Sequence, residues 1–306
     1  MKEHKRWGKK FKDRRDWRKY NEQLVVRGEF YLDCGWVKSW NKELEAMNDG
    51  KVGARYEYPD SFMRYLAVLH QWIDYRGLEG FARKLVEFSE LPQASDYSNV
   101  CRRVNRTDVK FELPKESCCV ATDGSGMKFE NAGEYRARMY GKRRKYIKVV
   151  ISADPNRKKM LNCEVGIEGE LPSEPDIARD HMEKLMLKGV DVKKFFGDGS
   201  YDDMDLWAFL EHNEIEPAVK PRKNAVLQGD KSLRDTEVLE IRKGYKKWGR
   251  ERQYGLRWNG TEGIFSSVKR KFGEQTRAHK VENACSEVKR KFWIYDRMKT
   301  YAERRA

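Results

Sequence analysis

The chain has 306 residues, enough for about two domains and a sizeable hydrophobic core. Charged residues make up 37% of it and hydrophobic residues 39%, including nine tryptophans, and this composition excludes a largely disordered chain. The net charge of +15 predicts a polyanionic partner, with nucleic acid as the first candidate. An anionic membrane is the weaker alternative, because the sequence contains no long apolar run and no basic amphipathic anchor.

The N-terminus is strongly basic. Residues 1–20 lack the apolar stretch of a signal peptide and are interpreted as a basic arm, with a solvated tail as the alternative. The six cysteines form no CxxC pair and the five histidines no HxxxH pair. We therefore expect a cytoplasmic protein with reduced thiols and no zinc site.

Helical periodicity dominates residues 21–113. Three helices are expected there, at residues 58–75, 78–91 and 96–106. Ser95 or Asp96 can cap the third helix, which also carries Arg102 and Arg103. Two helices separated by a short break, the second one basic, match the outline of a helix-turn-helix DNA reader. A small helical bundle with a basic surface is the alternative.

Strands and helices alternate in residues 114–278. Strands are expected at residues 118–129, 144–154, 158–169, 192–200 and 215–222. Helices are expected at residues 175–189, 201–213 and 262–274, and a final helix lies in residues 279–306. No element is predicted for the polar, basic residues 223–253. A three-stranded meander followed by alternating helices and strands predicts the α/β class, with a mixed-sheet, ribonuclease-H-like domain after an all-α N-terminal region.

Three acids fall at special positions of this predicted domain. Asp123 lies on the first, central strand, Asp198 ends the strand expected to pair parallel beside it, and Glu262 begins a helix packed on the sheet. Each also has an ordinary explanation. Asp123 and Asp198 precede glycines and could form turns, and Glu262 could simply favour the N-terminal end of a helix dipole. Together, however, the three acids indicate a catalytic site.

The residue types suit cleavage of a phosphodiester. Hydrolysis by two metal ions about 3.5–4 Å apart needs hard oxygen ligands, and Mg²⁺ prefers carboxylates, waters and substrate phosphates. We therefore expect Asp123, Asp198 and Glu262 to bind two Mg²⁺ ions, for which Mn²⁺ can substitute. Lys269 shares a helix face with Glu262, roughly 10 Å further along, and is placed to contact the next backbone phosphate.

The sequence around the third acid resembles the insertion-sequence transposases of the DDE superfamily. Tyr254, Arg257, Glu262 and Lys269 follow the Tyr-Arg-Glu-Lys signature of one group of that superfamily in order. Four residues separate Arg257 from Glu262, where the family usually has three. The stretches TDGSGMKF, GDGSYDD and PAVKPRKNA resemble the family's blocks around the first and second acids and after the following strand. The resemblance extends over roughly residues 20–295.

This resemblance implies a transposase that binds double-stranded DNA. It implies that the three acids bind divalent metals, nick the transposon ends to free a 3′-OH, and join that end to target DNA. The predicted DNA-binding residues are Tyr254, Arg257, Lys269, Arg102, Arg103, Arg143, Arg144, Lys145, Lys148, Lys220, Arg222 and Lys223.

Two further expectations and two alternatives complete the prediction. Transposition needs two DNA ends held together, so we expect a homodimer on DNA, in a prokaryotic cytoplasm at the nucleoid. One alternative is a transposase-derived DNA-binding protein without activity. The other is a ribonuclease-H-like DNA nuclease or resolvase, which cleaves without joining.

Overall fold

The computed structural model describes residues 15–88, 91–129, 146–229 and 232–305, with the backbone of two short strands, β1 (Lys5–Arg6) and β2 (Lys9–Lys10). By its internal contacts the chain forms two compact units, residues 1–62 with 297–306 and residues 63–296. These two units do not test the domain boundaries predicted at residues 20, 113 and 278, which stay a prediction.

The first unit is helical. Its elements are α1 (Trp17–Glu29), η1 (Phe30–Leu32), η2 (Gly35–Ser39), α2 (Trp40–Asn48) and the end of α12 (Val281–Arg305). Trp36 and Trp40 pack their rings 5.0 and 5.2 Å from the ring of Phe62. Arg305 pairs with Glu29 at 2.7 Å, which ties the last turn of α12 to α1. Aromatic packing therefore holds this small unit together.

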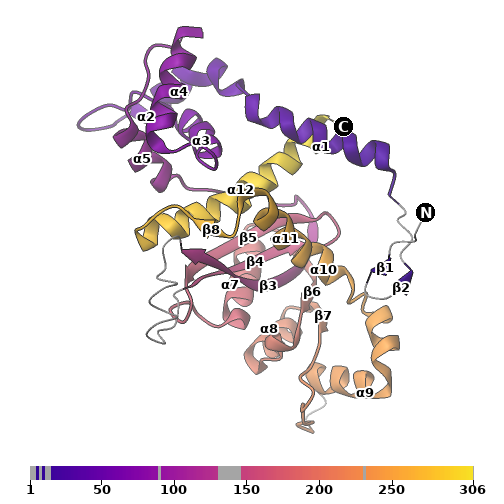
Figure 1. Cartoon of the computed structure of the whole chain (residues 1–306). Coiled ribbons are helices and arrows are strands. Elements are labelled where there is room, and N and C mark those ends of the chain that lie inside the picture. Colours follow the sequence, from indigo (N-terminus) through magenta and orange to yellow (C-terminus); the bar gives the residue numbers. More distant parts are fainter. Residues whose placement is uncertain are drawn as a thin grey trace, which may run out of the picture. The chain divides into compact units, whose positions relative to one another are not determined.

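A mixed β-sheet forms the centre of the second unit (Figure 1). Its strands are β3 (Ser117–Phe129), β4 (Tyr146–Asp154), β5 (Lys159–Ile167), β6 (Asp191–Gly197) and β7 (Glu216–Val219). They lie in the order β5-β4-β3-β6-β7, with β3, β4 and β5 antiparallel and β6 and β7 parallel to β3. The short β8 (Gln275–Thr276), which was not predicted, pairs with the far end of β3. This is the predicted ribonuclease-H-like order, so the fold class is confirmed.

Helices cover both faces of this sheet (Figure 1). On one face, α7 (Glu174–Met186) and α8 (Met204–His212) pack on Val120 and Phe195. On the other face, α11 (Glu262–Phe272) and α12 pack on Met127 and Ile151. Because side chains alternate along a strand, odd-numbered residues of β3 near the site point toward α11 and even-numbered residues point toward α7. This alternation decides on which face each candidate site residue lies.

Three shorter helices precede the sheet: α3 (Asp60–Leu69), α4 (Tyr75–Phe88) and α5 (Tyr97–Arg106). The prediction of one helix over residues 58–75 is wrong at its C-terminal end. Asp74 accepts a hydrogen bond of 2.7 Å from the backbone N–H of Gly77, so it starts a new helix instead of continuing the old one. Asp96 caps α5 as predicted, by accepting from the backbone of Ser98 and Asn99.

The stretch left without a predicted element contains a long helix, α9 (Leu233–Glu251). It is capped by Ser232, whose side chain accepts from the backbone of Asp235, and it is kinked at Gly244. Its many charged residues hide the apolar periodicity. Buried ionic contacts hold it instead, because Glu237 is fully buried and bonds with Trp248 and Arg252. Among the described residues, no helix is both long and apolar enough to span a membrane.

A buried chain of hydrogen bonds links β3 and β4 to α7. The hydroxyls of Thr122 and Ser152 lie 2.7 Å apart, and Ser152 lies 2.8 Å from Nδ1 of His181 on α7. All three residues are fully buried. Burial is the main cause that lowers the pKa of His181 from its ordinary 6.5 to about 4. The folded protein therefore keeps this histidine neutral.

This buried histidine predicts a loss of stability in mild acid. Its folded pKa is depressed, so the unfolded chain takes up the proton first, and stability is lost as pH falls from about 6.5 toward 4. At about 1.4 kcal/mol per pKa unit, His181 contributes about 3 kcal/mol to this loss. The free energy of unfolding, measured by urea titration at several pH values in that range, should fall less steeply with decreasing pH in His181→Gln than in the parent. Equal slopes would contradict the assignment.

Candidate catalytic site

The parallel pairing of β3 and β6 sets the positions of the first two acids. Ala121 pairs with Phe196 in this ladder. Asp123 and Asp198 each lie two residues further along, so they occupy equivalent positions at the carboxyl end of β6. Neighbouring strands are about 4.8 Å apart, and the site therefore has two adjacent acids.

Asp123 faces the α11 side of the sheet, because it pairs with Ile151 in β4 and alternates with Gly124. One of its oxygens accepts a hydrogen bond of 2.9 Å from the backbone N–H of Gly124. Burial raises the pKa of Asp123 from 3.8 to about 6. The Arg257 charge and the Gly124 hydrogen bond oppose this rise, while the nearby acids Asp198 and Glu174 add to it.

Asp198 follows β6 and organises the turn η3 (Gly199–Tyr201). One carboxylate oxygen accepts from the backbone N–H of Ser200 at 2.8 Å and from its hydroxyl at 2.6 Å. The ordinary interpretation of Asp198 as a turn former is thus also visible in the structure. A turn-forming role leaves the second carboxylate oxygen available for other partners, so the two interpretations are compatible.

Arg257 lies between the first and third acids. It belongs to the short helix α10 (Leu256–Gly260), and its side chain is nearly buried. Nη1 lies 3.5 Å from an oxygen of Asp123, and Nη2 lies 3.7 Å from an oxygen of Glu262. Its Nε is buried and makes no hydrogen bond to any described residue. The guanidinium therefore balances two carboxylates through long contacts.

The extra residue between Arg257 and Glu262 does not move the arginine out of the site. Helix α10 ends at Gly260 and α11 begins at Glu262, with Thr261 in a non-helical conformation between them. This break can accommodate one additional residue, because the two helices need not share one register. Tyr254 packs behind the arginine: its ring lies 5.6 Å from the guanidinium and 5.0 Å from the ring of Trp248. Burial raises the pKa of Tyr254 to about 12, so the ring stays neutral.

The donor chemistry of these acids fits a hard divalent cation. In the described part of the chain, no three acidic, histidine or cysteine side chains are arranged to hold a metal ion. Arg257 supplies the positive charge between Asp123 and Glu262 in this arrangement. A divalent metal ion would offer the same carboxylates a stronger compensating charge.

The other predicted contact residues lie at several places. Lys269 is half-buried on α11 and forms no ion pair with a described residue. Lys220 lies 5.5 Å from the ring of Tyr245, and Lys148 pairs with Glu174 at 2.8 Å. Lys148 is therefore occupied, although it was predicted to contact phosphates. Arg143, Arg144 and Lys145 lie outside the described residues.

The basic residues of α5 lie on a helix whose end is anchored. Arg102 is exposed and Arg103 half-buried. The buried Arg290 of α12 donates to the backbone oxygen of Val104 at 3.0 Å and to the side chain of Asn105 at 3.3 Å. This contact satisfies the carbonyl end of α5 and fixes the helix relative to α12.

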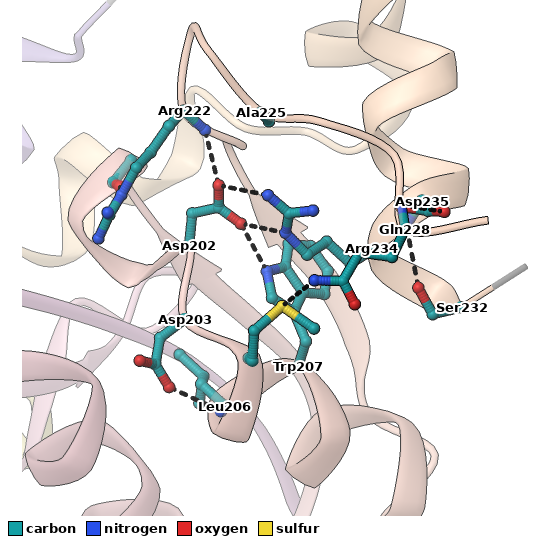
Figure 2. Close-up of polar contacts among 12 residues, drawn as sticks. Asp202, Asp203, Leu206, Trp207, Arg222, Ala225, Gln228, Ser232, Arg234 and Asp235 are labelled. Atoms are coloured by element: carbon teal, nitrogen blue, oxygen red, sulfur yellow. Dashed lines mark hydrogen bonds and ion pairs between the residues drawn. The ribbon is translucent and has the colours of Figure 1, made fainter. Parts of the chain in front are cut away.

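Arg222 belongs to a loop that is clamped beside the Asp198 turn. Figure 2 shows Asp202 accepting from the backbone N–H of Arg222, from Trp207 and from both Nε and Nη2 of Arg234. The Arg222 side chain donates to the backbone oxygen of Gly199 at 3.3 Å. The carboxylate of Asp202, four residues after Asp198, thus holds the loop after β7 and the start of α9 against the site.

Sequence reasoning missed two residues that adjoin these acids, Glu174 and Tyr201. The Tyr201 hydroxyl donates to Glu174 at 3.1 Å. Tyr201 begins one predicted helix and Glu174 directly precedes another, and an aromatic residue or an acid has an ordinary explanation at such positions. The nearby residue Ser173, which caps α7, was the only local signal that Glu174 stands in a first turn.

Comparison with known proteins now decides the family. Two family models, both described as a transposase DDE domain, match residues 25–132 and 114–305. The second match covers more than half of the chain. The chain belongs to the DDE transposases. Among solved structures, the piggyBac transposase synaptic complex with hairpin DNA is similar at 13% identity and a TM-score of 0.37, over 92% of this chain and 78% of that one. No curated protein matches.

The position of Arg257 predicts an unusual response of this transposase to metal. In Arg257→Gln the acids lose their internal counter-charge, so the melting temperature should fall in chelator. Excess Mg²⁺ should then raise it by about 3 °C more than in the parent, because no ion pairs must be broken first. Differential scanning fluorimetry measures both values. Arg252→Gln, which removes an ion pair to the distant Glu237, is the matched control and should show the parent's Mg²⁺ response. An equal Mg²⁺ response in the parent and Arg257→Gln would refute the idea.

Proposed function

We propose that this transposase binds the ends of an insertion sequence, cleaves the DNA there by two-metal phosphodiester hydrolysis, and joins the freed 3′-OH to target DNA. The observation that carries the proposal is the alignment of Asp123, within β3, beside Asp198, at the end of the adjacent parallel strand β6, with Glu262 linked to Asp123 through Arg257. The family match supports the chemistry in general terms.

Asp123, Asp198 and Glu262 are proposed to hold the divalent cations, Mg²⁺ or Mn²⁺. Such cations activate the attacking water and stabilise the leaving oxygen. The water oxygen then bonds to phosphorus while the bond to the 3′ oxygen breaks, which leaves a 3′-OH and a 5′ phosphate. In the second step the 3′-OH attacks a phosphate of the target, the bond from that phosphorus to the target's own 3′ oxygen breaks, and the target strand is left with a 3′-OH. The carboxylates position these reactants and neutralise none of the DNA charge themselves.

Arg257 and Lys269 are proposed to neutralise the DNA phosphates next to the cut. Arg257 has an unbonded Nε and long ion pairs, so it can turn part of its guanidinium toward a phosphate oxygen. Tyr254 supports it from behind as a packed ring. These roles would place the chain in the group with the Tyr-Arg-Glu-Lys signature, and Lys269, on the same helix face as Glu262 and about two turns further along, would contact the adjacent phosphate.

The remaining partners are proposed on the same basis. Arg102 and Arg103 of α5, with Lys220 and Arg222 beside the site, would bind double-stranded DNA at the transposon end. Two ends must be held together for transposition, so we propose a homodimer on DNA. This work would take place at the nucleoid of a prokaryotic cell.

Asp198→Asn provides the sharpest test of the catalytic assignment. The amide is nearly isosteric and can still accept from Ser200, so the turn and the fold should survive. An anionic metal ligand is lost, and nicking and strand transfer should both fall by about three orders of magnitude. Asp123→Asn and Glu262→Gln should behave alike, and double substitutions should cost little more. Gel-based end cleavage with Mg²⁺ or Mn²⁺ measures these rates.

The control is DNA affinity, which should stay within a few-fold of the parent because an acid facing phosphates has been removed. Parent-like cleavage by the Asp198→Asn variant would overturn the metal-ligand role. Cleavage of transposon ends by the parent, with no joining of a pre-cut end to target DNA, would instead favour the nuclease or resolvase alternative.

Arg102→Ala tests the proposed DNA reader. Base contacts specify a sequence whereas phosphate contacts only position the protein. Fluorescence anisotropy should therefore show weaker binding to the transposon end, by about tenfold, with a smaller loss on random duplex DNA. Arg106→Ala, an exposed position at the end of the same helix, is the comparison variant. Equal losses on both DNAs would leave α5 as a general phosphate-binding surface.

A further inference from the structure

The segment from the end of β7 to the end of α9 carries a large excess of positive charge. Residues 220–252 contain eleven lysines and arginines against five acidic residues. The structure describes four of these acids, and each of them is already engaged. Asp235 and Glu237 are buried, whereas Glu240 and Glu251 pair with lysines of the same helix. The cations without an acidic partner therefore give this segment its charge.

Lys246 and Arg250 form the outward face of the second half of α9. The helix is kinked at Gly244, and Trp248 is the buried residue of the turns that follow. At roughly 100° per residue, the positions two before and two after Trp248 project from the opposite side of the helix. Both cations are exposed, and neither forms an ion pair with a described residue. Nε of Arg250 donates to the backbone oxygen of Lys246 at 3.3 Å, so the two lie on successive turns of one face.

The loop after β7 adds another exposed cation, Lys223. The first half of α9 holds this loop through its backbone. Arg242 donates to the backbone oxygen of Ala225 at 2.8 Å, and Arg234 donates to the next backbone oxygen at 3.0 Å. The loop and α9 are thus bonded into one unit, whose cations keep a fixed spacing.

The second half of α9 lies next to the strand end that carries the second acid. The ammonium of Lys220 lies 5.5 Å from the ring of Tyr245, which precedes Lys246. The backbone N–H of Lys220 donates to the carbonyl of Gly197 at 3.4 Å. Gly197 ends β6 and directly precedes Asp198. One lysine therefore connects the outward face of α9 to the catalytic edge of the sheet.

Helices α5 and α9 lie on opposite sides of the acids (Figure 1). The chain reaches α9 from β7, the edge strand beyond β6. In contrast, α5 is bonded to α12, which packs on β4 and β5. Asp123 and Asp198 lie between these positions, on β3 and at the end of β6. A duplex that extends from the acids toward α5 in one direction therefore extends toward α9 in the other.

We propose that the exposed cations of this segment bind the backbone of the duplex DNA that flanks the transposon end, beyond the scissile phosphate. These cations are Lys223, Lys246 and Arg250. The inference rests on the proposed function, which assigns α5 to the transposon end itself. Cations at a fixed spacing fit the phosphates of a duplex, and phosphate contacts carry no sequence information. Such a surface suits a flank, whose sequence differs from one insertion site to the next.

The affinity of the full-length protein for two duplexes tests this proposal. Both duplexes carry the end of the insertion sequence. One stops at the cleavage site, and the other continues into the flank for about two helical turns, roughly 20 base pairs. Fluorescence anisotropy in the presence of a chelator measures binding without cleavage. The parent should bind the longer duplex more tightly, because only this duplex reaches α9.

Lys246→Ala combined with Arg250→Ala should remove most of this preference. Affinity for the longer duplex should fall by about tenfold, and the slope of log affinity against log salt should fall by about 0.9 for each lost contact. Affinity for the shorter duplex should stay within about twofold of the parent, because its phosphates end at the cleavage site.

Lys243→Ala combined with Lys247→Ala is the matched control. It removes two lysines of the same helix that already pair with Glu240 and Glu251, and it changes the net charge equally. It should therefore keep the parent's preference for the longer duplex within about twofold. The positions changed in both variants are exposed and alanine favours the helix, so both proteins should fold.

Three results separate this inference from the proposed function. An equal loss on both duplexes would place the contacts on the transposon end and overturn the flank assignment. No loss on either duplex would leave α9 a solvated charged face, which also overturns it. Both results leave the proposed function intact if the parent cleaves and Asp198→Asn does not. A loss confined to the longer duplex, in a protein that fails to cleave, would support the α9 surface and overturn the proposed chemistry.

Discussion

The mutual repulsion of the carboxylates where β3 passes the end of β6 is the constraint around which the site is built. Partly buried acids at adjacent strand ends are costly unless a positive charge lies between them. Arg257 supplies that charge for Asp123 and Glu262, and Lys148 supplies it for Glu174. Each cation reaches the site from a different element. The helices and strands that carry them are therefore held in place partly by the same charges that the chemistry requires.

The sheet gives this arrangement its rigidity. Asp123 lies on the central strand, which is paired on both sides and continues beyond the end of β6. Below it, the buried chain of Thr122, Ser152 and His181 joins two strands to α7, the helix that begins with Glu174. A helix fixed in this way cannot shift its first residue easily. The position of Glu174 beside β3 thus depends on polar contacts in the core as well as on apolar packing.

The segment between β7 and α11 is held in place by ionic contacts and brings Arg257 to the candidate site. Asp202 binds the loop after β7 and the start of α9, while Glu237 binds the far half of α9 through Trp248 and Arg252. The chain then returns through Tyr254 to Arg257. Ionic contacts thereby hold the polar segment between the end of β7 and α10, which leads to the arginine that faces the acids.

The sequence by itself determined the order of strands and helices in the sheet domain up to β7 and the cap at Asp96, because these depend on local periodicity and local hydrogen bonds. The three acids follow from residue chemistry and stay a prediction. It did not predict α9, whose stabilising contacts link residues far apart and leave no regular apolar pattern. It also did not predict Glu174, Tyr201 or the contacts of Arg257. Only the tertiary structure decided those, since the parallel register and the break at Thr261 act on distances between elements, which no local pattern records.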